Sequence, residues 1–255
     1  MFDMFKIPFK YFLQKLLGFE RFLYTFSLFT IFRMRLGFSN KEFKYFLNLI
    51  PEDGNILDLG SNIGITAVPM AKRASRGRVL CFEPIPVHIK TLRKVARHFH
   101  LSNVEIFETA LGEKNGELLM VMPVFYKVRF QGFSHVVKQD PDKNKGDLFT
   151  VPVQRLDSVQ ALQKLDKIDA VKIDVENFEY PILLGAEDLL MRHKPIIYCE
   201  LWKDEKRSLT INYLKNKFGY QAKIFKKNKL EDFTGQTASN FFFVWSNQNA
   251  SPKFT

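Results

Sequence analysis

Two acidic residues each follow a short apolar run, and a glycine-rich turn lies beside the first of them. Asp58 stands near the end of the first run, and the turn after it carries Gly60 and Gly64. Glu83 stands directly after the next run. Glycines let the backbone approach a bound molecule closely. A carboxylate at the tip of the second strand of an open α/β sheet is placed to accept hydrogen bonds from ribose hydroxyls. The pattern therefore indicates a cofactor that contains a nucleoside.

The turn differs from two other nucleotide-binding loops. A dinucleotide fingerprint needs glycines spaced G-x-G-x-x-G, and Asn62 occupies the middle position here. A phosphate-binding P-loop would end in Gly-Lys-Ser/Thr, which does not follow. The carboxylate of Asp58 also suits an amine-bearing ligand better than a pyrophosphate. These differences disfavour a nicotinamide dehydrogenase, although a ribose-binding acid would serve that class as well as S-adenosylmethionine enzymes.

A second group of ionisable residues is expected at the same sheet edge, where a base would be useful. Asp174 and Glu200 end two expected strands, and Glu176 and Glu179 follow Asp174 in the next turn. His135 lies in an insertion expected to fold over the cleft. Transfer to an oxygen nucleophile needs a base near the reacting atom, and crowded carboxylates can raise one pKa into a useful range. We expect Asp174 to be the base, with His135, Glu176 and Glu200 as further catalytic candidates. A purely structural alternative is that Glu176 and Glu179 stabilise a helix N-terminus.

Carboxylates are also ligands that divalent metals prefer. Asp157, Asp174 and Glu200 are the residues such a site would use, but nothing in their spacing demands a metal, and we expect none. Four other histidines fall on expected helices or at their ends and are predicted to be surface residues, namely His88, His98, His100 and His193.

The elements that position these residues alternate between strands and helices. Strands are expected at 55–59, 78–82, 104–107, 168–173 and 195–201, and helices at 63–74, 86–99 and 178–191. Such alternation predicts βαβ crossovers and a mostly parallel α/β sheet with helices on both faces. The runs 222–225 and 241–245 predict a closing antiparallel pair. The interval 113–156 breaks the rhythm and predicts an inserted hairpin, with strands at 117–122 and 149–154 around the polar stretch 138–147.

The first 50 residues differ from the rest in composition. They hold 12 of the 27 phenylalanines, and eight basic residues against three acidic ones, with apolar residues at helical spacing. We expect a helical extension over 1–50 and one domain over 51–255. The extension is predicted to be a helical cap on that domain, an amphipathic element on an anionic membrane surface, or a dimer contact.

The composition of the 255 residues is that of a globular protein, with a net charge of +11. That charge favours anionic partners without choosing among them, and solubility alone explains it equally well. Cys81 and Cys199 lie in apolar runs and are predicted to be buried, reduced residues of a cytoplasmic protein. No run approaches the roughly 18 apolar residues that a membrane span requires, so membrane contact would be peripheral.

The motifs as a group resemble the FkbM family of class I S-adenosylmethionine-dependent methyltransferases. The resemblance extends from about residue 56 to residue 201 and is carried by the segments 58–64, 82–84, 109–112, 153–157, 171–179, 184–186 and 194–200. One position departs from the family pattern, because Asn177 stands where a glycine is usual. Asparagine tolerates the left-handed backbone conformation better than other non-glycine residues, so the turn is expected to persist.

The resemblance implies a Rossmann-like fold, S-adenosylmethionine as cofactor, and roles for individual residues. The turn would cradle the methionine part of the cofactor, and Asp58 would lie near its amino group. Glu83, followed by Pro84, would bind the ribose hydroxyls, and Thr109 and Ala110 would flank the adenine. The turn residues concerned are Gly60, Ser61, Asn62 and Gly64.

The resemblance also implies the reaction class, which is O-methylation of a hydroxyl on a sugar, a glycan or a related natural product, as in polysaccharide biosynthesis. The partner would then be a small-molecule or glycan acceptor. RNA methylation is an alternative prompted by the charge, although no RNA-binding module is recognisable and no specific nucleic-acid partner is expected. A non-catalytic nucleotide-binding module is the second alternative. The sequence does not indicate an oligomeric state.

Overall fold

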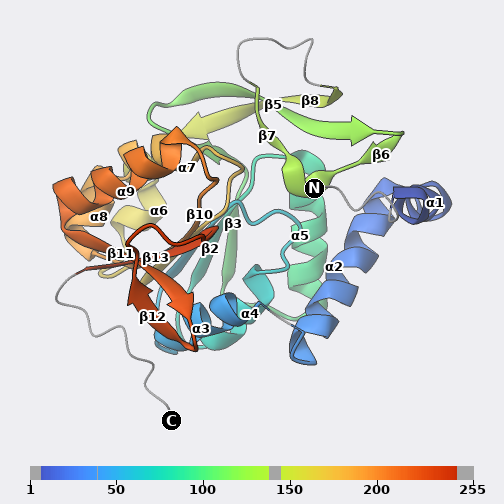
Figure 1. Ribbon diagram of the computed structural model, residues 1–255. Helices are drawn as coiled ribbons and strands as arrows, with labels where there is room; N and C mark the ends of the chain where they lie inside the picture. Colours follow the sequence, from blue (N-terminus) through green and yellow to red (C-terminus); the bar gives the residue numbers. More distant parts are fainter. Residues whose placement is uncertain (1–6, 39, 138–144, 246–255) are drawn as a thin grey trace.

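A computed structural model describes residues 7–38, 40–137 and 145–245 of the chain. Its centre is an eight-stranded sheet with the order β12-β11-β13-β10-β9-β1-β2-β3 (Figure 1). The strands from β10 to β3 run parallel, and β13, β11 and β12 are antiparallel to their neighbours. The predicted mixed α/β sheet with an antiparallel C-terminal pair is confirmed. The strands are β1 (Ile56–Leu59), β2 (Val79–Phe82), β3 (Val104–Phe107), β9 (Ala170–Ile173), β10 (Ile196–Glu200), β11 (Tyr220–Lys226), β12 (Lys229–Asp232) and β13 (Asn240–Trp245).

The register of the parallel strands brings the expected site residues to one edge of the sheet. Leu59 at the end of β1 pairs with Phe82 of β2 and Ile173 of β9. Ile173 pairs in turn with Cys199 of β10. The chain therefore leaves the sheet at neighbouring points, with Gly60 after β1, Glu83 after β2, Asp174 after β9 and Glu200 at the end of β10.

Alternate residues of the parallel strands feed two hydrophobic cores, because successive side chains point to opposite faces of a sheet. Leu57 and Leu59 belong to one core and Ile56 to the other. Since helices cover both faces, the strands are apolar on both sides. The first core takes in α6 (Gln160–Gln163), α7 (Glu179–Leu184), α8 (Glu187–His193) and α9 (Glu205–Phe218), and the second takes in α3 (Lys41–Leu49), α4 (Ala67–Arg73) and α5 (Pro86–His98).

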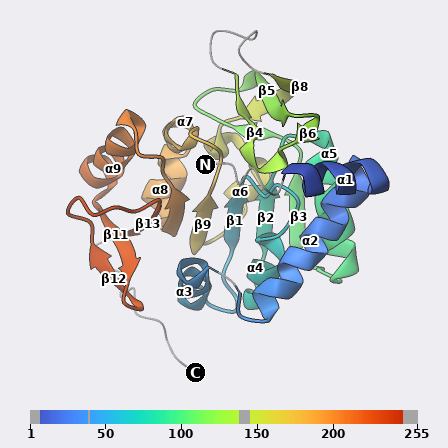
Figure 2. The ribbon, with the colours of Figure 1, turned by 45° about the vertical axis from the view of Figure 1, so that its right-hand side comes forward.

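A smaller sheet lies above the carboxyl edge of the central one (Figure 2). The predicted hairpin is its main part, because β5 and β8 pair antiparallel along most of their length. The stretch 138–144 of the expected polar loop lies outside the described residues. The elements of this region are β4 (Ala110–Leu111), β5 (Gly116–Phe125), β6 (Val128–Arg129), η2 (Gln131–Phe133), β7 (His135–Val136), β8 (Gly146–Gln154) and η4 (Leu156–Ser158).

Two helices, α1 (Ile7–Leu17) and α2 (Phe19–Arg35), precede α3 in the N-terminal region (Figure 2). Phe22 and Leu23 of α2 pack against Ile63 of the glycine turn. The side chain of Gln14 on α1 donates to the carbonyl of Arg129 and accepts from its backbone N–H, both at 3.0 Å. Within the described ranges, no helix is long and apolar enough to cross a lipid bilayer.

Two helices differ from the prediction. The helix expected at 63–74 begins only at Ala67, because the left-handed turn around Gly64 (φ 84°) precedes it. The helix expected at 178–191 is broken into α7 and α8 at Gly185, where a Cβ would lie 2.0 Å from the carbonyl oxygen of Gly112. The Asp157 carboxylate accepts hydrogen bonds from the backbone N–H groups of Asp188 and Leu189. It thereby caps the N-terminus of α8. Periodicity alone does not reveal such a break, since both helices bury apolar residues on the same core.

Candidate active site

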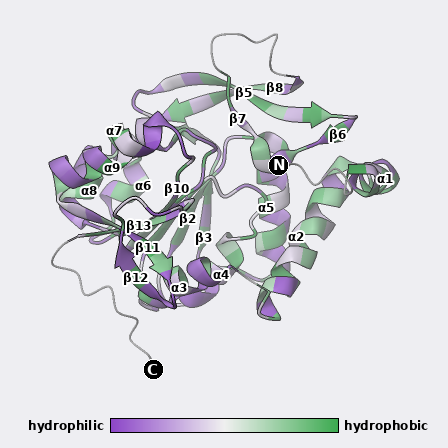
Figure 3. Cartoon of the chain, viewed as in Figure 1, coloured by the Kyte–Doolittle hydropathy of each residue, from purple (hydrophilic) through white to green (hydrophobic). Residues whose placement is uncertain are grey.

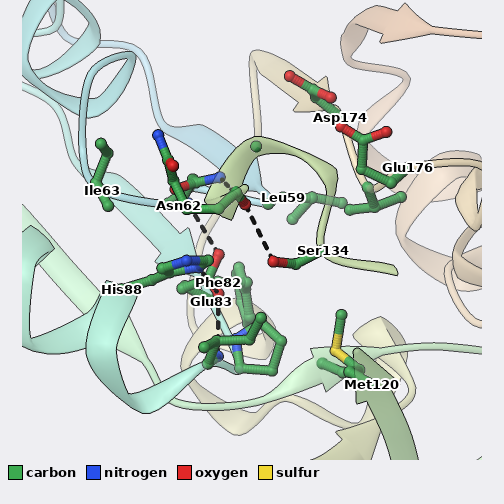
Figure 4. A pocket seen from close by; sticks show the side chains of 18 of the residues that line it. Leu59, Asn62, Ile63, Phe82, Glu83, His88, Met120, Ser134, Asp174 and Glu176 are labelled. Carbon is green, nitrogen blue, oxygen red and sulfur yellow. Dashed lines mark hydrogen bonds and ion pairs between the residues drawn. The ribbon is translucent and has the colours of Figure 1, made fainter. Parts of the chain in front are cut away.

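A cavity of about 490 Å³ opens at the carboxyl edge of the parallel strands. Its floor, the cavity floor below, consists of the turn 60–62, Glu83 and Asp174 (Figure 4). Its cover, the cavity roof below, consists of Lys10 on α1, Phe26 on α2 and the segment 131–134. Open α/β sheets bind ligands at this edge, where the strand order reverses. Here β2 lies on one side of β1 and β9 on the other, so the cavity has this position.

The backbone of the glycine turn packs closely against the ends of the neighbouring strands. Gly60 has a φ of 80°, and a Cβ there would lie 2.0 Å from the carbonyl oxygen of Asp174. The backbone N–H groups of Gly60 and Ser61 both donate to the carbonyl of Phe82, at 3.0 and 3.1 Å. Asn62 also has a left-handed backbone, with a φ of 47°. Of the turn residues predicted for the cofactor, Gly60, Ser61 and Asn62 line the cavity and Gly64 does not.

Glu83 lies in the cavity floor and is almost fully buried (Figure 4). Its Oε2 accepts from the backbone N–H of Asn62 at 2.9 Å, and its Oε1 accepts from that of Ile85 at 3.0 Å. The Nδ1 of His88 lies 3.1 Å from the same Oε1. These contacts fix the carboxylate in one orientation beside the glycine turn.

Two polar atoms beside Glu83 have no hydrogen-bond partner among the described residues. They are Oδ1 of Asn62 and Nε2 of His88, both buried, and both residues line the cavity. Buried polar groups are normally satisfied, so these atoms indicate a polar ligand at this end of the cavity. The prediction that His88 is a surface residue is wrong, because its side chain is 1% exposed. Its position in the first turn of α5, five residues after Glu83, was the available signal.

Thr109, Ala110 and Pro84 all line the cavity. The Thr109 hydroxyl donates to backbone carbonyls, with Ala110 at 2.9 Å and Pro152 at 3.1 Å. Ile85 and Met120 line the same part of the cavity. This apolar end fits a flat heterocycle, and the polar end beside Glu83 fits a sugar. The residues present therefore fit the adenosine part of S-adenosylmethionine.

Asp58 does not line the cavity, contrary to the expected contact with an amino group of the cofactor. It is fully buried under the glycine turn, where Oδ2 accepts from the Thr66 hydroxyl at 2.9 Å and Oδ1 lies 3.3 Å from Nζ of Lys172. Burial alone would lower the pKa of Lys172, but the charges of Asp58 and Asp174 raise it above its usual range. A buried ion pair of this kind is stable only while both partners are present.

Lys172 is a site residue that the sequence reasoning missed. Its Nζ donates to the carbonyl of Gly60 at 3.1 Å and lies 3.6 Å from Oδ2 of Asp174. One ammonium group thus joins the buried Asp58, the glycine turn and the cavity-lining Asp174. The signal available was a lysine inside an otherwise apolar parallel strand, which is buried on both faces and so requires a charged partner.

Four acids were expected at this edge of the sheet, namely Asp174, Glu176, Glu179 and Glu200. Of these, Asp174 and Glu176 line the cavity and the other two do not. Burial, together with the charges of Asp174 and Glu200, raises the pKa of Glu176 to about 8. Burial and the Asp174 charge raise the pKa of Glu200 to about 7. Glu179 is buried and accepts from the backbone N–H of Asn177 at 3.1 Å, which agrees with the structural alternative for this residue.

The turn that holds Glu176 adopts the left-handed conformation expected for it. Glu176 has a φ of 54° and Asn177 one of 69°. The Asn177 side chain donates to Asp204 at 2.8 Å, and the backbone carbonyl of Asn177 accepts from Nζ of Lys206, also at 2.8 Å. Asparagine thus replaces glycine here with support from outside the turn, and the turn directs Glu176 toward the cavity (Figure 4).

His135 lies near the cavity but does not line it, although Ser134 and Val136 on either side do. Its Nδ1 is 2.8 Å from the carbonyl oxygen of Phe133. Because successive side chains of an extended chain point in opposite directions, Ser134 and Val136 face the cavity and His135 between them does not. The structure therefore does not support His135 as a base. In the described part of the chain, no group of three or more His, Cys, Asp or Glu residues is arranged to hold a metal ion.

Lys10 enters the site from the N-terminal extension and was also missed. Its Nζ donates to Oε1 of Gln131 at 3.2 Å and lies 4.4 Å from the centre of the Phe130 ring. Burial lowers the pKa of Lys10 to about 8. The spacing of Lys10 and Gln14 on one helix face was the only sequence signal, and it is equally typical of a solvated surface.

Comparison with known proteins finds a matching family model and similar sequences. The family model of the methyltransferase FkbM domain matches residues 58–222. AMB antimetabolite synthetase AmbE of Pseudomonas aeruginosa is 26% identical over 168 residues, which are 55% of this chain and 8% of that protein. Methyltransferase sdnD of Sordaria araneosa is 28% identical over 181 residues, covering 60% of this chain and 68% of that one.

A solved structure shares the fold. Methyltransferase FkbM from Methylobacillus flagellatus KT superposes with a TM-score of 0.53 at 18% identity, covering 76% of this chain and 44% of that one. The chain thus spans less than half of that protein and a small part of the synthetase. The matched residues contain the glycine turn, Glu83 and the acids that follow β9 and end β10, and the chain belongs to the methyltransferase FkbM domain family.

Proposed function

We propose that this protein transfers the methyl group of S-adenosylmethionine to a hydroxyl group of a sugar, a glycan or a related natural product. The observation that carries the proposal is that the carboxylates of Asp174 and Glu176 line the same cavity as Glu83. A hydroxyl must lose its proton as the new bond forms, and a carboxylate beside the cavity is the group that would accept it.

The floor residues support the choice of cofactor. When bound, S-adenosylmethionine supplies a methyl group that is already activated by its sulfonium. Glu83 would accept hydrogen bonds from the ribose hydroxyls, with Asn62 and His88 offering the two unpartnered polar atoms beside it. Thr109 and Ala110 would flank the adenine. Lys172 also lines the cavity, and its ammonium group contacts Asp174 and the carbonyl of Gly60 in the floor.

Glu176 is the carboxylate best suited to act as the base. Its pKa of about 8 makes it a stronger base than an ordinary carboxylate, and it lines the cavity. An efficient general base has a pKa near the working pH. Asp174, which the sequence favoured, would contribute the negative charge that helps to raise the pKa of Glu176. Glu200 would contribute in the same way from outside the cavity.

The acceptor can be sought with radiolabelled S-adenosylmethionine and fractionated cell extract. Incubation with the protein is expected to place label in the carbohydrate or small-molecule fraction, in a product stable to alkali, because a methyl ether resists the hydrolysis that removes a methyl ester. Glu176→Gln is expected to lower transfer by about a hundredfold or more. Glu105 is partly exposed on the outer strand β3, where it pairs with Arg78, and provides the matched control Glu105→Gln, which is expected to leave transfer unchanged.

Three outcomes would contradict the proposal or its assignment of the base. Label that appears in RNA would mean that the acceptor is a nucleic acid, which is the alternative suggested by the net charge of +11. An unchanged rate for Glu176→Gln together with a loss for Asp174→Asn would assign the base to Asp174. Absence of transfer to any fraction, with tight cofactor binding retained, would favour a non-catalytic module.

A further inference from the structure

The outer sides of α1 and α2 carry two apolar stripes that the fold leaves exposed. Figure 3 shows hydrophobic residues recurring along both helices at the rim of the molecule, away from the central sheet. The members are more than half exposed and recur with the spacing i, i+3, i+7 on each helix, which places them on one side of it. We call them the α1–α2 apolar face: Phe9, Phe12 and Leu16 on α1, and Phe29, Phe32 and Leu36 at the end of α2.

Packing does not require these side chains. The inner side of α2 already buries Phe22 and Leu23 against Ile63, and Ile31 against Val68 and Val95. Monomeric soluble proteins rarely expose large contiguous apolar patches, and those that do commonly use them for binding. The exposed apolar residues on the outer sides of α1 and α2 therefore indicate a binding surface.

The charge around the face indicates what that occupant is. The basic residues Lys15, Arg21 and Arg33 are exposed on the same two helices. Between residues 7 and 38 the sole acid is Glu20, and its carboxylate is held by Lys90 on α5 at 2.7 Å. The Arg33 guanidinium lies 5.9 Å from the centre of the Phe29 ring, so cation and aromatic ring are presented together. Exposed phenylalanines with basic neighbours, and no unpaired acid within residues 7–38, are complementary to an anionic bilayer surface.

The face is also continuous with the candidate active site. Phe26, one helical turn before Phe29, is 38% exposed and at the same time lines the cavity. Lys10, on the helix that carries Phe9 and Phe12, lies in the cavity roof. A surface seated on α1 and α2 would thus lie against the roof of the cavity.

We propose that the α1–α2 apolar face docks on an anionic lipid bilayer, with the phenylalanines in the interface and the basic residues on the headgroups. The cavity roof would then lie at the membrane, where an acceptor attached to lipid can reach it. The docking itself does not depend on the proposed methyl transfer, so each can fail without the other.

Co-sedimentation of the full chain with vesicles tests the proposal. Binding is expected to mixed phosphatidylcholine–phosphatidylglycerol vesicles, and to be much weaker to phosphatidylcholine alone. The double variant Phe29→Ser/Phe32→Ser is expected to reduce the affinity for anionic vesicles about tenfold or more, because two interfacial side chains are lost. Lys15→Gln and Arg33→Gln are expected to reduce it by about fivefold each and to weaken its salt dependence.

A matched control uses apolar residues with similar exposure on other helices. Met191→Ser/Leu209→Ser changes α8 and α9, which lie on the other side of the central sheet from α2 in Figure 1, and is expected to leave vesicle binding unchanged. Thermal unfolding of each variant shows that it is folded. The charge variants keep the proposal testable if the phenylalanine variant is unstable.

Three results would overturn the proposal. One is equal binding to neutral and anionic vesicles, and another is unchanged binding by both the phenylalanine and the charge variants. The third is a protein that ignores vesicles but forms a dimer in solution that Phe29→Ser/Phe32→Ser dissociates. That last result would assign the face to a second copy of the chain.

Discussion

The cavity floor and the cavity roof are built in different ways, although they face the same cavity. The floor is held by the backbone of adjacent parallel strands and by the buried charges of Asp58 and Lys172. The roof is held by side-chain contacts between segments far apart in sequence, such as Gln14 with Arg129 and Lys10 with Gln131. The geometry of the floor is therefore set by the sheet, while that of the roof depends on a few side-chain contacts between distant segments.

The largest effect is expected from removing the buried cation of the floor. Lys172→Met leaves the carboxylate of Asp58 buried without a counter-charge, so the free energy of unfolding is expected to fall by about 3–5 kcal/mol. Denaturant unfolding measures this. Lys167→Met removes an exposed lysine that pairs with Asp169, and is expected to cost about 1 kcal/mol or less. Similar losses for the two variants would show that the floor does not depend on its buried pair.

The next effect concerns the close approach at the glycine turn. Gly60→Ala places a Cβ 2.0 Å from the Asp174 carbonyl oxygen, at a φ of 80°. Unfolding free energy is expected to fall by about 2–4 kcal/mol, and cofactor affinity to fall with it, because the turn must move. Gly37 has a similar φ of 90°, but a Cβ there would have no atom within 4 Å. Gly37→Ala therefore introduces the backbone strain without the steric clash. That control is expected to cost about 1–2 kcal/mol, and equal costs would contradict the proposed role of crowding.

A pH-dependent effect is expected from Glu176. Folding raises the pKa of Glu176 from its ordinary value of 4.5 to about 8. Between these values the folded chain retains a proton that the unfolded chain has lost, so stability falls as the pH rises through this range. Glu176→Gln is therefore expected to stabilise the protein at pH 8 relative to pH 5, by an amount on the order of 1–3 kcal/mol. Thermal unfolding of both proteins across this range is the measurement.

The same residue gives a kinetic test. If Glu176 is the base, the rate of methyl transfer rises with pH up to about 8. Asp174→Asn removes a negative charge that raises the pKa of Glu176, so the rise is expected at a lower pH in that variant. If the pH–rate profile of Asp174→Asn is the same as that of the unmodified protein, the charge of Asp174 does not influence the pKa of Glu176.

The smallest effect is expected in the roof. Gln14→Ala removes two hydrogen bonds to the backbone of Arg129 and is expected to cost about 1–2 kcal/mol in stability. Cofactor affinity is expected to change less than threefold or so, because no floor residue moves. Lys15→Ala on the same helix is exposed and serves as the control. A cofactor affinity as strongly reduced as in Gly60→Ala would remove the distinction between floor and roof.

The floor could be predicted from the sequence because its residues follow directly from strand ends. Once the apolar runs were assigned as neighbouring parallel strands, Gly60, Glu83 and Asp174 had to emerge at one edge. Asp58 could not be placed in the same way, because the position of a residue along a strand does not show whether the following turn covers its side chain. Lys172 was missed for a related reason, since its partners become visible only when Asp58 is seen to be buried.

The roof was beyond prediction because its contacts join segments more than a hundred residues apart in the chain. His135 illustrates the difficulty, since its immediate neighbours line the cavity and it does not. In a two-residue strand such as β7, a shift of one position reverses which side chain faces inward. The helical character of the extension was predicted from its spacing, but the entry of Lys10 into the cavity was not.

Calorimetric titration with S-adenosylmethionine and S-adenosylhomocysteine tests the central claim, that the cavity floor is a cofactor site built around Glu83. We expect micromolar binding of both adenosyl compounds by the protein, no binding of NAD, and a loss of about a hundredfold or more in Glu83→Ala, which removes the fixed carboxylate. Binding of NAD alone, or adenosyl binding that survives in Glu83→Ala, would contradict the account.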